Sequence, residues 1–406
     1  MSAVLRAVRL AAAAILPRAV VSVPFAVCAG LAELALCVWL LFLPVQERRL
    51  LGLTLALDGF RRVYCLVAAF LWAMTLLFSP WYFAHHHRRN RYYFFNLMTL
   101  GATLGVFLAA DLLTAFVFFE VMSFTSYPWV AQEEEPEALR AAETYLAVAV
   151  IGGLVALMGL FLLQHTLGTL RLAELYDRAR VCQNRGVLYA AGGCILFGFG
   201  AKAGMFPLHI WLPKAHPVAP APASAILSGI IAKAGVLAIV RVLYYAVGAD
   251  FLRGTWVQTA LIMLALITVF MGSMMALKVT VLKKRLAYSS VSQVSYVLFG
   301  LFMLNETAFQ GALLHVYFHS IMKNLLFLCA GGIILKTGLT DVRDLRGIGK
   351  RMPATLWCFT LAGVSLVGVP PLCGFFSKWE LAQGAMASGV AVFSWLGPVV
   401  LLVSAL

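Results

Sequence analysis

The sequence contains few charged residues, and acidic ones are the scarcest. Asp and Glu together number 17 in 406 residues, and charged residues make up 12% of the chain against 62% hydrophobic residues. Soluble domains usually hold about 45–50% apolar and about 25% charged residues. A soluble fold is therefore excluded, and the lipid bilayer is the solvent for nearly all of the chain.

The sequence also lacks any spacing that is typical of a metal or redox site. The eight cysteines are scattered, without a C-x-x-C or similar pattern, and are interpreted as small apolar residues. The histidines of residues 85–87 resemble a metal-binding tract, but three adjacent histidines in a basic connector converge poorly on one ion. The sequence therefore predicts no cofactor and no metal.

Long apolar runs recur along the whole chain. A helix needs about 20 apolar residues to cross the roughly 30 Å of hydrocarbon in a bilayer. The runs predict an all-α, polytopic membrane protein with about twelve transmembrane helices. The predicted helices lie near residues 20–43, 63–83, 93–110, 112–131, 142–165, 187–210, 218–246, 256–277, 286–304, 308–336, 353–381 and 387–406.

The distribution of positive charge predicts how the chain lies in the membrane. The basic connectors 85–91, 278–285 and 336–351 fall on one side if the helices alternate. The positive-inside rule makes that side cytoplasmic, with the N-terminus, in a bacterial or archaeal cell membrane. Residues 48–62 are the exception, since they place four arginines outside. Because the net charge of +14 lies in short connectors, no nucleic-acid partner is expected.

The start of the chain, residues 1–16, is a basic amphipathic stretch. No small-residue cleavage site follows a compact apolar region there, so we interpret the stretch as retained and not as a signal peptide.

Two predicted helices are interrupted by proline. Pro207 lies in GFGAKAGMFPLHIWLPKAH, and Pro370 and Pro371 lie in VSLVGVPPLCGFFSKWE. Proline removes a backbone hydrogen bond and clashes with the preceding turn, so each helix should break there. After an N-terminal part, 1–92, the breaks predict five-helix repeats at 93–246 and 256–406. An odd helix number inverts the second repeat, as in transporters whose broken helices mark the ion site; two unrelated kinks are the alternative.

Three predicted helices carry a charged residue near the middle of the membrane: Glu120, Lys202 and Lys233. Such a charge costs at least about 2.5–3.5 kcal/mol, and it usually pairs or lines a wet cavity. Burial disfavours the charged form of a lysine, whereas a nearby carboxylate favours it. A Glu120–Lys202 pair could therefore release a proton from the lysine when the two groups separate.

A further helix carries three titratable residues on one stripe. His315, His319 and Lys323 are spaced i, i+4 and i+8. Histidine titrates near neutral pH and can pass a proton between its nitrogens, so the stripe predicts a proton wire. His315 could instead be a packing residue that is bonded to a carbonyl.

Lys378 follows the second proline break, and Glu380 lies two residues further on. Both could equally be anchors in the headgroup region. Glu33, Asp111 and His165 are interpreted as structural, because each is a single polar residue near a helix end or in an apolar run.

These motifs resemble the antiporter-like proton-translocating subunits of respiratory complex I, multisubunit Na⁺/H⁺ antiporters and membrane-bound energy-converting hydrogenases of the formate-hydrogenlyase type. The resemblance covers roughly residues 55–406. It is carried by AKAGMFPLHIWLPKAHPVAPAPASAILSGIIAKAG, LDGFRRV, FFEVMSF, HVYFHSIMKNLLFLCAG and GVPPLCGFFSKWEL.

The resemblance implies a role for each buried ionisable residue. Glu120 and Lys202 are the input pair, and Lys233, His315, His319, Lys323 and Lys378 are the relay and exit site. It also implies that the subunit binds no redox cofactor and receives energy from partner membrane subunits.

The sequence departs from the family pattern in three places. By this resemblance the first family helix is missing and the last is not reached by Leu406, so the chain is a shortened variant or a fragment. Lys214 stands where complex I relatives commonly carry aspartate, which favours the hydrogenase branch.

The sequence therefore predicts a proton-translocating membrane subunit of a complex I-like or hydrogenase-like redox complex. The alternatives are a subunit of a Na⁺/H⁺ antiporter and an inert scaffold. A quinone-reacting or other redox enzyme is disfavoured by the lack of cofactor-ligand spacing.

Overall fold

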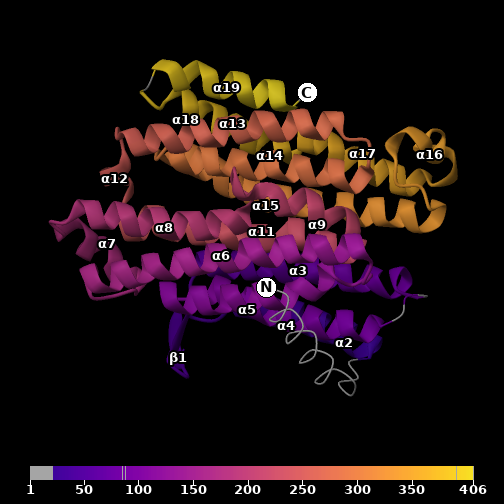
Figure 1. Ribbon diagram of the computed structural model, residues 1–406, viewed down its shortest axis with the longest axis horizontal. Coiled ribbons are helices and arrows are strands. Elements are labelled where there is room, and N and C mark those ends of the chain that lie inside the picture. The colour runs from indigo at the N-terminus through magenta and orange to yellow at the C-terminus, as the bar shows by residue number, and fades with distance from the viewer. Residues whose placement is uncertain (1–21, 85, 87, 390, 406) are drawn as a thin grey trace.

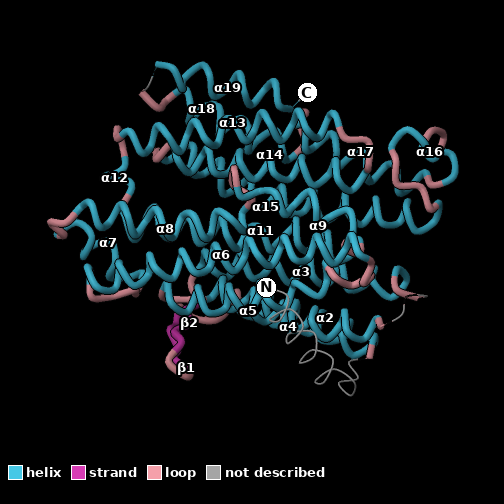
Figure 2. Tube along the Cα trace, viewed as in Figure 1, coloured by secondary structure: helices cyan, strands magenta, loops and turns pink. Residues whose placement is uncertain are grey.

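The computed structural model describes residues 22–84, 86, 88–389 and 391–405. The helices run side by side as one bundle, with a small β-hairpin projecting at one end (Figures 1 and 2). Among the described residues, seven helical segments are long and apolar enough to cross a membrane, and shorter apolar helices accompany them. The predicted polytopic α-helical fold is confirmed. The basic stretch 1–16, and His85 and His87 of the histidine tract, lie outside the described residues.

Each predicted span overlaps one helix or a run of consecutive helical segments, with ends shifted by a few residues. The first part of the chain forms α2 (Val23–Leu40), α3 (Gly59–Tyr82), α4 (Arg89–Leu108), α5 (Leu112–Val130), α6 (Pro136–Leu167), α7 (Leu172–Val181), α8 (Arg185–Ala203), η1 (Leu208–Trp211) and α9 (Leu212–Val218). The middle forms α10 (Ala221–Ile226), η2 (Leu227–Ile231), α11 (Ala232–Arg241), η3 (Val242–Val247), α12 (Ala249–Leu252) and α13 (Trp256–Lys278). The last part forms α14 (Leu282–Phe302), α15 (Glu306–Thr337), η4 (Val342–Leu345), α16 (Ile348–Arg351), α17 (Pro353–Val367), α18 (Cys373–Met386) and α19 (Ala391–Ala405).

Polar residues start several of these helices. Asp58, Asp111 and Asn305 precede α3, α5 and α15, and each side chain accepts a hydrogen bond from the backbone N–H three residues further on. Such caps satisfy backbone donors that a helix leaves unpaired in its first turn. Asp111 is therefore a structural residue.

The hairpin of β1 (Gln46–Leu50) and β2 (Leu53–Leu57) was not predicted from the sequence. Its strands pair in antiparallel register around Leu51 and Gly52, which both have positive φ angles. Turns of this kind match the twist of two short strands. The strands are too short to stand out from a connector by their residue pattern.

Two of the four arginines in residues 48–62 bind the carboxyl ends of helices. Arg61 donates to the carbonyl of Ala109 after α4, and Arg62 donates to the carbonyls of Leu41 and Leu43 after α2. A cation is stabilised by the unpaired carbonyls at a helix C-terminus. These contacts give a local structural reason for arginines that depart from the positive-inside pattern.

Both spans that were predicted to break at Pro207 and at Pro370 and Pro371 are broken. In the first, α8 ends at Ala203, Gly204 has φ +79°, and Pro207 precedes η1. In the second, α17 ends at Val367 and Gly368 has φ +96°. The prolines Pro370 and Pro371 then lie before α18. A left-handed glycine ends each first half-helix, because it adopts this conformation without a Cβ clash.

Features of the first half recur about 170 residues later. The isolated β-bridge between Asp111 and Arg171 has a counterpart between Val281 and Asp341. Both α6 and α15 have 32 residues, and each ends at a left-handed glycine. In Figure 1 the short helices that follow the bridges, α7 and α16, lie at opposite ends of the bundle. This arrangement fits an inverted second repeat, while the boundaries 93–246 and 256–406 stay a prediction.

Candidate functional site

Lys202 lies in the last turn of α8, just before the first break, and is buried. Its ammonium donates to the hydroxyl of Tyr145 in α6 and lies 4.3 Å from the centroid of that ring. The Tyr145 hydroxyl also lies 2.5 Å from Ser126 Oγ in α5. Three helices therefore position the lysine through one tyrosine.

Glu120, the predicted partner of Lys202, is half-buried in α5. Its Oε1 is buried without a hydrogen-bond partner, and no ion pair joins it to the lysine, which binds Tyr145. The charge of Glu120 still acts on both Tyr145 and Lys202. The structure thus shows no direct contact between Glu120 and Lys202, and Tyr145 is the direct partner of the lysine.

Lys233 lies in the first turn of α11, directly after the π-helical segment η2. Its ammonium donates to the carbonyl of Ser228 inside that segment. The Ser228 hydroxyl lies 2.7 Å from Ser290 Oγ of α14. A π-helical turn changes the regular backbone pattern, and such turns are frequent at functional sites.

The predicted stripe on α15 is completely buried: His315, His319 and Lys323 are each 0% exposed. The rings of His315 and His319 stack with centroids 5.8 Å apart. Neither nitrogen of His319 has a hydrogen-bond partner. The stripe therefore faces the interior of the bundle along two turns of the helix.

The two ends of this stripe are tied to neighbouring helices. His315 Nδ1 lies 2.9 Å from Ser377 Oγ of α18, and its Nε2 lies 2.9 Å from Gln293 Oε1 of α14. Lys323 donates to the carbonyl of Leu286 at 3.0 Å and to the Ser289 hydroxyl, both in α14.

Lys378 is held against the end of the second broken helix. Its ammonium donates to the carbonyls of Leu366 at 2.8 Å and Val367 at 3.1 Å, in the last turn of α17. It also lies 4.7 Å from the centroid of the Tyr296 ring. This ring stacks on His315, with centroids 5.7 Å apart. These contacts turn the lysine toward the histidine stripe.

Four other predicted relay residues lie near enough to His319 for their charges to act on it. The charges that act on this histidine belong to Lys233, Lys323, His315 and Lys378. Lys202 and Glu120 do not belong to this group. The helix that carries Lys202, α8, packs closely on α11, because a Cβ on Gly235 would lie 3.3 Å from the Cβ of Lys202.

Sequence reasoning missed several polar residues of this interior. His216 is 0% exposed, has no partner on either ring nitrogen and stacks on Phe327 at 4.7 Å. Lys323, Lys283 and Lys233 act on it electrostatically. Its position in WLPKAH was visible, but nothing in the pattern showed that its ring is buried.

Arg241 was also missed, although it is a charge within a predicted span. It is buried, and it donates to the carbonyls of Val106 and Phe107 at 2.7 Å each. These carbonyls belong to the last turn of α4, so the arginine caps that helix.

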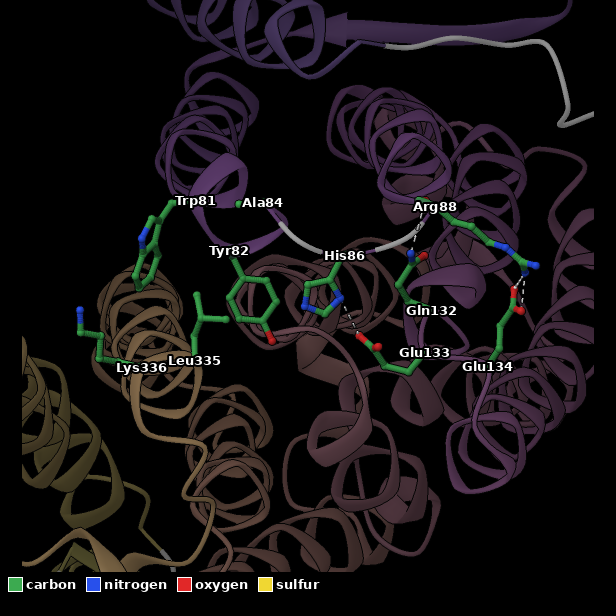
Figure 3. A pocket seen from close by; sticks show the side chains of 10 residues that line it. All are labelled: Trp81, Tyr82, Ala84, His86, Arg88, Gln132, Glu133, Glu134, Leu335 and Lys336. Carbon is green, nitrogen blue, oxygen red and sulfur yellow. Dashed lines mark hydrogen bonds and ion pairs between the residues drawn. The ribbon is translucent and has the colours of Figure 1, made fainter.

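A wide groove of about 690 Å³ lies elsewhere (Figure 3). It is lined by the ends of α3 and α15, the connector after α3 and the loop after α5. His86 points toward Glu133 at 3.6 Å, and Arg88 pairs with Glu134. Burial raises the pKa of Glu134, but hydrogen bonds from Arg91 and Arg88 outweigh it and hold the pKa below its usual range. None of the predicted relay residues lines this groove.

The fold and the site together define a polytopic α-helical membrane protein with two broken helices and a row of buried ionisable side chains. Residues 109–404 match the family described as NADH:quinone oxidoreductase/Mrp antiporter, TM. The chain belongs to this family, and the resemblance to antiporter-like subunits is confirmed.

The chain is similar to subunits of different complexes. It is 36% identical over 310 residues to NADH-quinone oxidoreductase subunit N of Desulforudis audaxviator, which is 76% of this chain and 61% of the relative. The chain thus spans less than two thirds of that relative. It is 31% identical over 334 residues to a Na⁺/H⁺ antiporter subunit of Alkalihalophilus pseudofirmus, which is 82% of this chain and 67% of the relative.

A solved structure shares the fold. A chain of the membrane-bound sulfane sulfur reductase, an archaeal respiratory membrane complex, superimposes with a TM-score of 0.85 and 26% identity. The match covers 94% of this chain and 80% of that one. The relatives therefore include subunits of both redox and antiporter complexes.

Proposed function

We propose that this chain is a proton-translocating subunit of a complex I-like or energy-converting hydrogenase-like redox complex. Protons move through Glu120, Lys202, Lys233, the α15 stripe and Lys378, coupled to electron transfer in partner subunits. The observation that carries the proposal is the cluster of buried bases around His319. Several buried basic groups that face one another are costly in a membrane, and function is the usual reason for keeping them.

The composition of this interior favours protons over sodium. Sodium ions prefer oxygen ligands such as carboxylates and carbonyls. Among the described residues, Asp111, which caps α5, is the most buried acidic side chain, and Glu120 of α5 is half-buried. The buried bases His315, His319 and Lys323 offer nitrogens that accept or release protons instead.

The path has an input segment and an output segment. Glu120, Tyr145 and Lys202 form the input, where the carboxylate controls how readily the lysine holds its proton. Lys233, the stripe and Lys378 form the output, because His315 contacts the residue next to Lys378. The close approach of α8 and α11 at Gly235 supports transfer between the two segments.

A component of a Na⁺/H⁺ antiporter is the second candidate, because one relative at 31% identity carries that name. An inert scaffold is disfavoured, since unpartnered histidines such as His319 and His216 would cost free energy without a use. In either transport function the chain would assemble with other membrane subunits. We also propose that the connectors 278–285 and 336–351 face the cytoplasm, with the N-terminus.

The test uses the complex that purifies with a tagged copy of this chain, reconstituted in vesicles. Lys233→Met keeps the side-chain volume and removes the charge, and Lys336→Met is the matched control at an exposed lysine. We expect electron-driven proton movement to fall at least about tenfold in the first variant, since a positioned proton carrier contributes about 100-fold or more, and to persist in the second. Wild-type movement in Lys233→Met would overturn the proposal. Proton movement that needs a sodium gradient and no electron donor would replace it with the antiporter function.

A further inference from the structure

A small cavity lies beside Lys233, on the side facing α3 and α15. Its volume of about 10 Å³ gives room for about one water molecule. Polar side chains from three helices line it: Tyr64 of α3, Lys233 of α11, and Tyr317 and Ser320 of α15. A buried water needs two to four polar partners, and these lining side chains supply them.

The buried hydroxyl of Tyr64 is a second sign that this cavity holds a ligand. It is 3% exposed, and its hydroxyl oxygen is buried without a hydrogen-bond partner. Its ring packs between Tyr317 and Phe107, at centroid distances of 5.1 and 5.5 Å. Because an unsatisfied buried hydroxyl is costly, a partner for it is expected in the cavity that it lines.

The side chains beyond the cavity show what such a water would do. Arg241 lies two turns after Lys233 on the same face of α11 and holds the carbonyl of Phe107, which lines the cavity. Arg61 holds the next free carbonyl, that of Ala109. A proton that left Lys233 in this direction would meet two guanidinium groups. Their positive charge disfavours proton transfer in this direction.

We propose that this cavity binds one water molecule, which joins the ammonium of Lys233 to the hydroxyl of Tyr64. Lys233 has one protein partner, the Ser228 carbonyl, so the water gives its ammonium a second acceptor. The water accepts from Lys233 and donates to Tyr64 Oη, and no proton passes through it. The water stabilises the charged form of Lys233 against its burial and against the repulsion of Lys323. Tyr64 is thus a positioning residue for the relay, and this role rests on the proposed function.

The experiment uses the same reconstituted complex. Tyr64→Phe keeps the ring packing and removes only the hydroxyl. Tyr244→Phe is the matched control, because its hydroxyl donates to the Leu301 carbonyl, its ring packs on Phe309, and it follows α11 in η3. A cryo-EM map that resolves water should show one water within hydrogen-bond reach of Lys233 Nζ and Tyr64 Oη, and should lose it in Tyr64→Phe.

The transport rates give the second readout. We expect Tyr64→Phe to slow proton movement by about tenfold, the effect of one hydrogen bond to a charged group, and to shift the pH optimum down. Tyr244→Phe should keep the wild-type rate and optimum. An empty cavity in the wild-type map overturns the site, and a wild-type rate and optimum in Tyr64→Phe overturn its role. If Lys233→Met also transports normally, the proposed function itself fails; if only Lys233→Met is inactive, only the water proposal fails.

Discussion

The two halves of the molecule use the same helix position for different chemistry. Tyr145 in α6 and His315 in α15 are 170 residues apart, like the two β-bridges. Tyr145 ties α6 to the first broken helix through Lys202, and His315 ties α15 to the second through Ser377. Each also contacts the preceding long helix, at Ser126 and Gln293. In each half, one side chain on the long helix therefore links it to two neighbouring helices. We expect the chemistry of that side chain to decide whether a proton can pass through the contact.

The two halves also carry charges of opposite sign at equivalent places, between α5 and α6 in the first half and between α14 and α15 in the second. In the first half Glu120 extends from α5 toward Gly153 of α6. The residues 170 positions later are Ser290 in α14 and Lys323 in α15, so the charged group comes from the other helix and has the other sign. The first half can tune one lysine with a carboxylate. Among the described residues, the buried side chains of the second half that can carry a charge are lysines and histidines, and in the proposed function they pass a proton among themselves.

The largest effects should come from replacing the two linking side chains, His315 and Tyr145, in turn. His315→Phe deletes a titratable group, so we expect proton movement to fall by about 100-fold. Tyr145→Phe deletes only a hydrogen bond to Lys202 and should cost about tenfold. Rates in the reconstituted complex measure both, with the exposed His165→Phe as control. Equal losses in the two variants would contradict the assigned difference between the halves.

A smaller effect is expected at Gly153. A Cβ there would lie 2.4 Å from Glu120 Oε1, so Gly153→Ala must displace the carboxylate. Because that oxygen ends a flexible side chain, we expect a destabilisation of at most about 1 kcal/mol, the low end for overpacking, measured by thermal unfolding in detergent. Gly101→Ala is the control, since a Cβ at that position meets nothing within 4 Å. A neutral Gly153→Ala would show that α6 does not constrain Glu120.

The smallest effect should be at Glu134, outside the membrane spans. Its lowered pKa means that the folded protein holds this carboxylate ionised to lower pH than the unfolded chain does. The stabilisation is therefore complete above about pH 4.3, the usual glutamate value, and is lost as the pH falls through the lowered pKa. Glu134→Gln should cost about 0.5 kcal/mol at neutral pH, as exposed ion pairs do. Thermal unfolding at pH 7 and pH 3 checks this, because the difference between the variant and the wild type should shrink at the lower pH.

Much of the fold could be predicted from the sequence, because apolar length and proline breaks act locally along the chain. The buried positions of Lys202, Lys233 and the α15 stripe could be predicted for the same reason, since their neighbours in the sequence are apolar. The hairpin and the π-helical segment could not, because they are too short to leave a pattern.

The partners of the charged residues depend on which helices meet. The sequence suggested that Glu120 would pair with Lys202, yet the lysine binds Tyr145, an uncharged residue that no search for buried charge would select. His216 and Tyr64 were missed for the same reason: their polar atoms matter only because packing removes them from solvent.

The most direct test of the central claim is proton movement in the reconstituted complex with Lys202→Met. Lys214→Met is the matched control, because this lysine lies in the same broken span but is exposed on α9. We expect Lys202→Met to lose proton movement by about 100-fold, with the complex still assembled, and Lys214→Met to keep the wild-type rate. Wild-type proton movement in assembled Lys202→Met would contradict a relay that begins at Glu120 and Lys202.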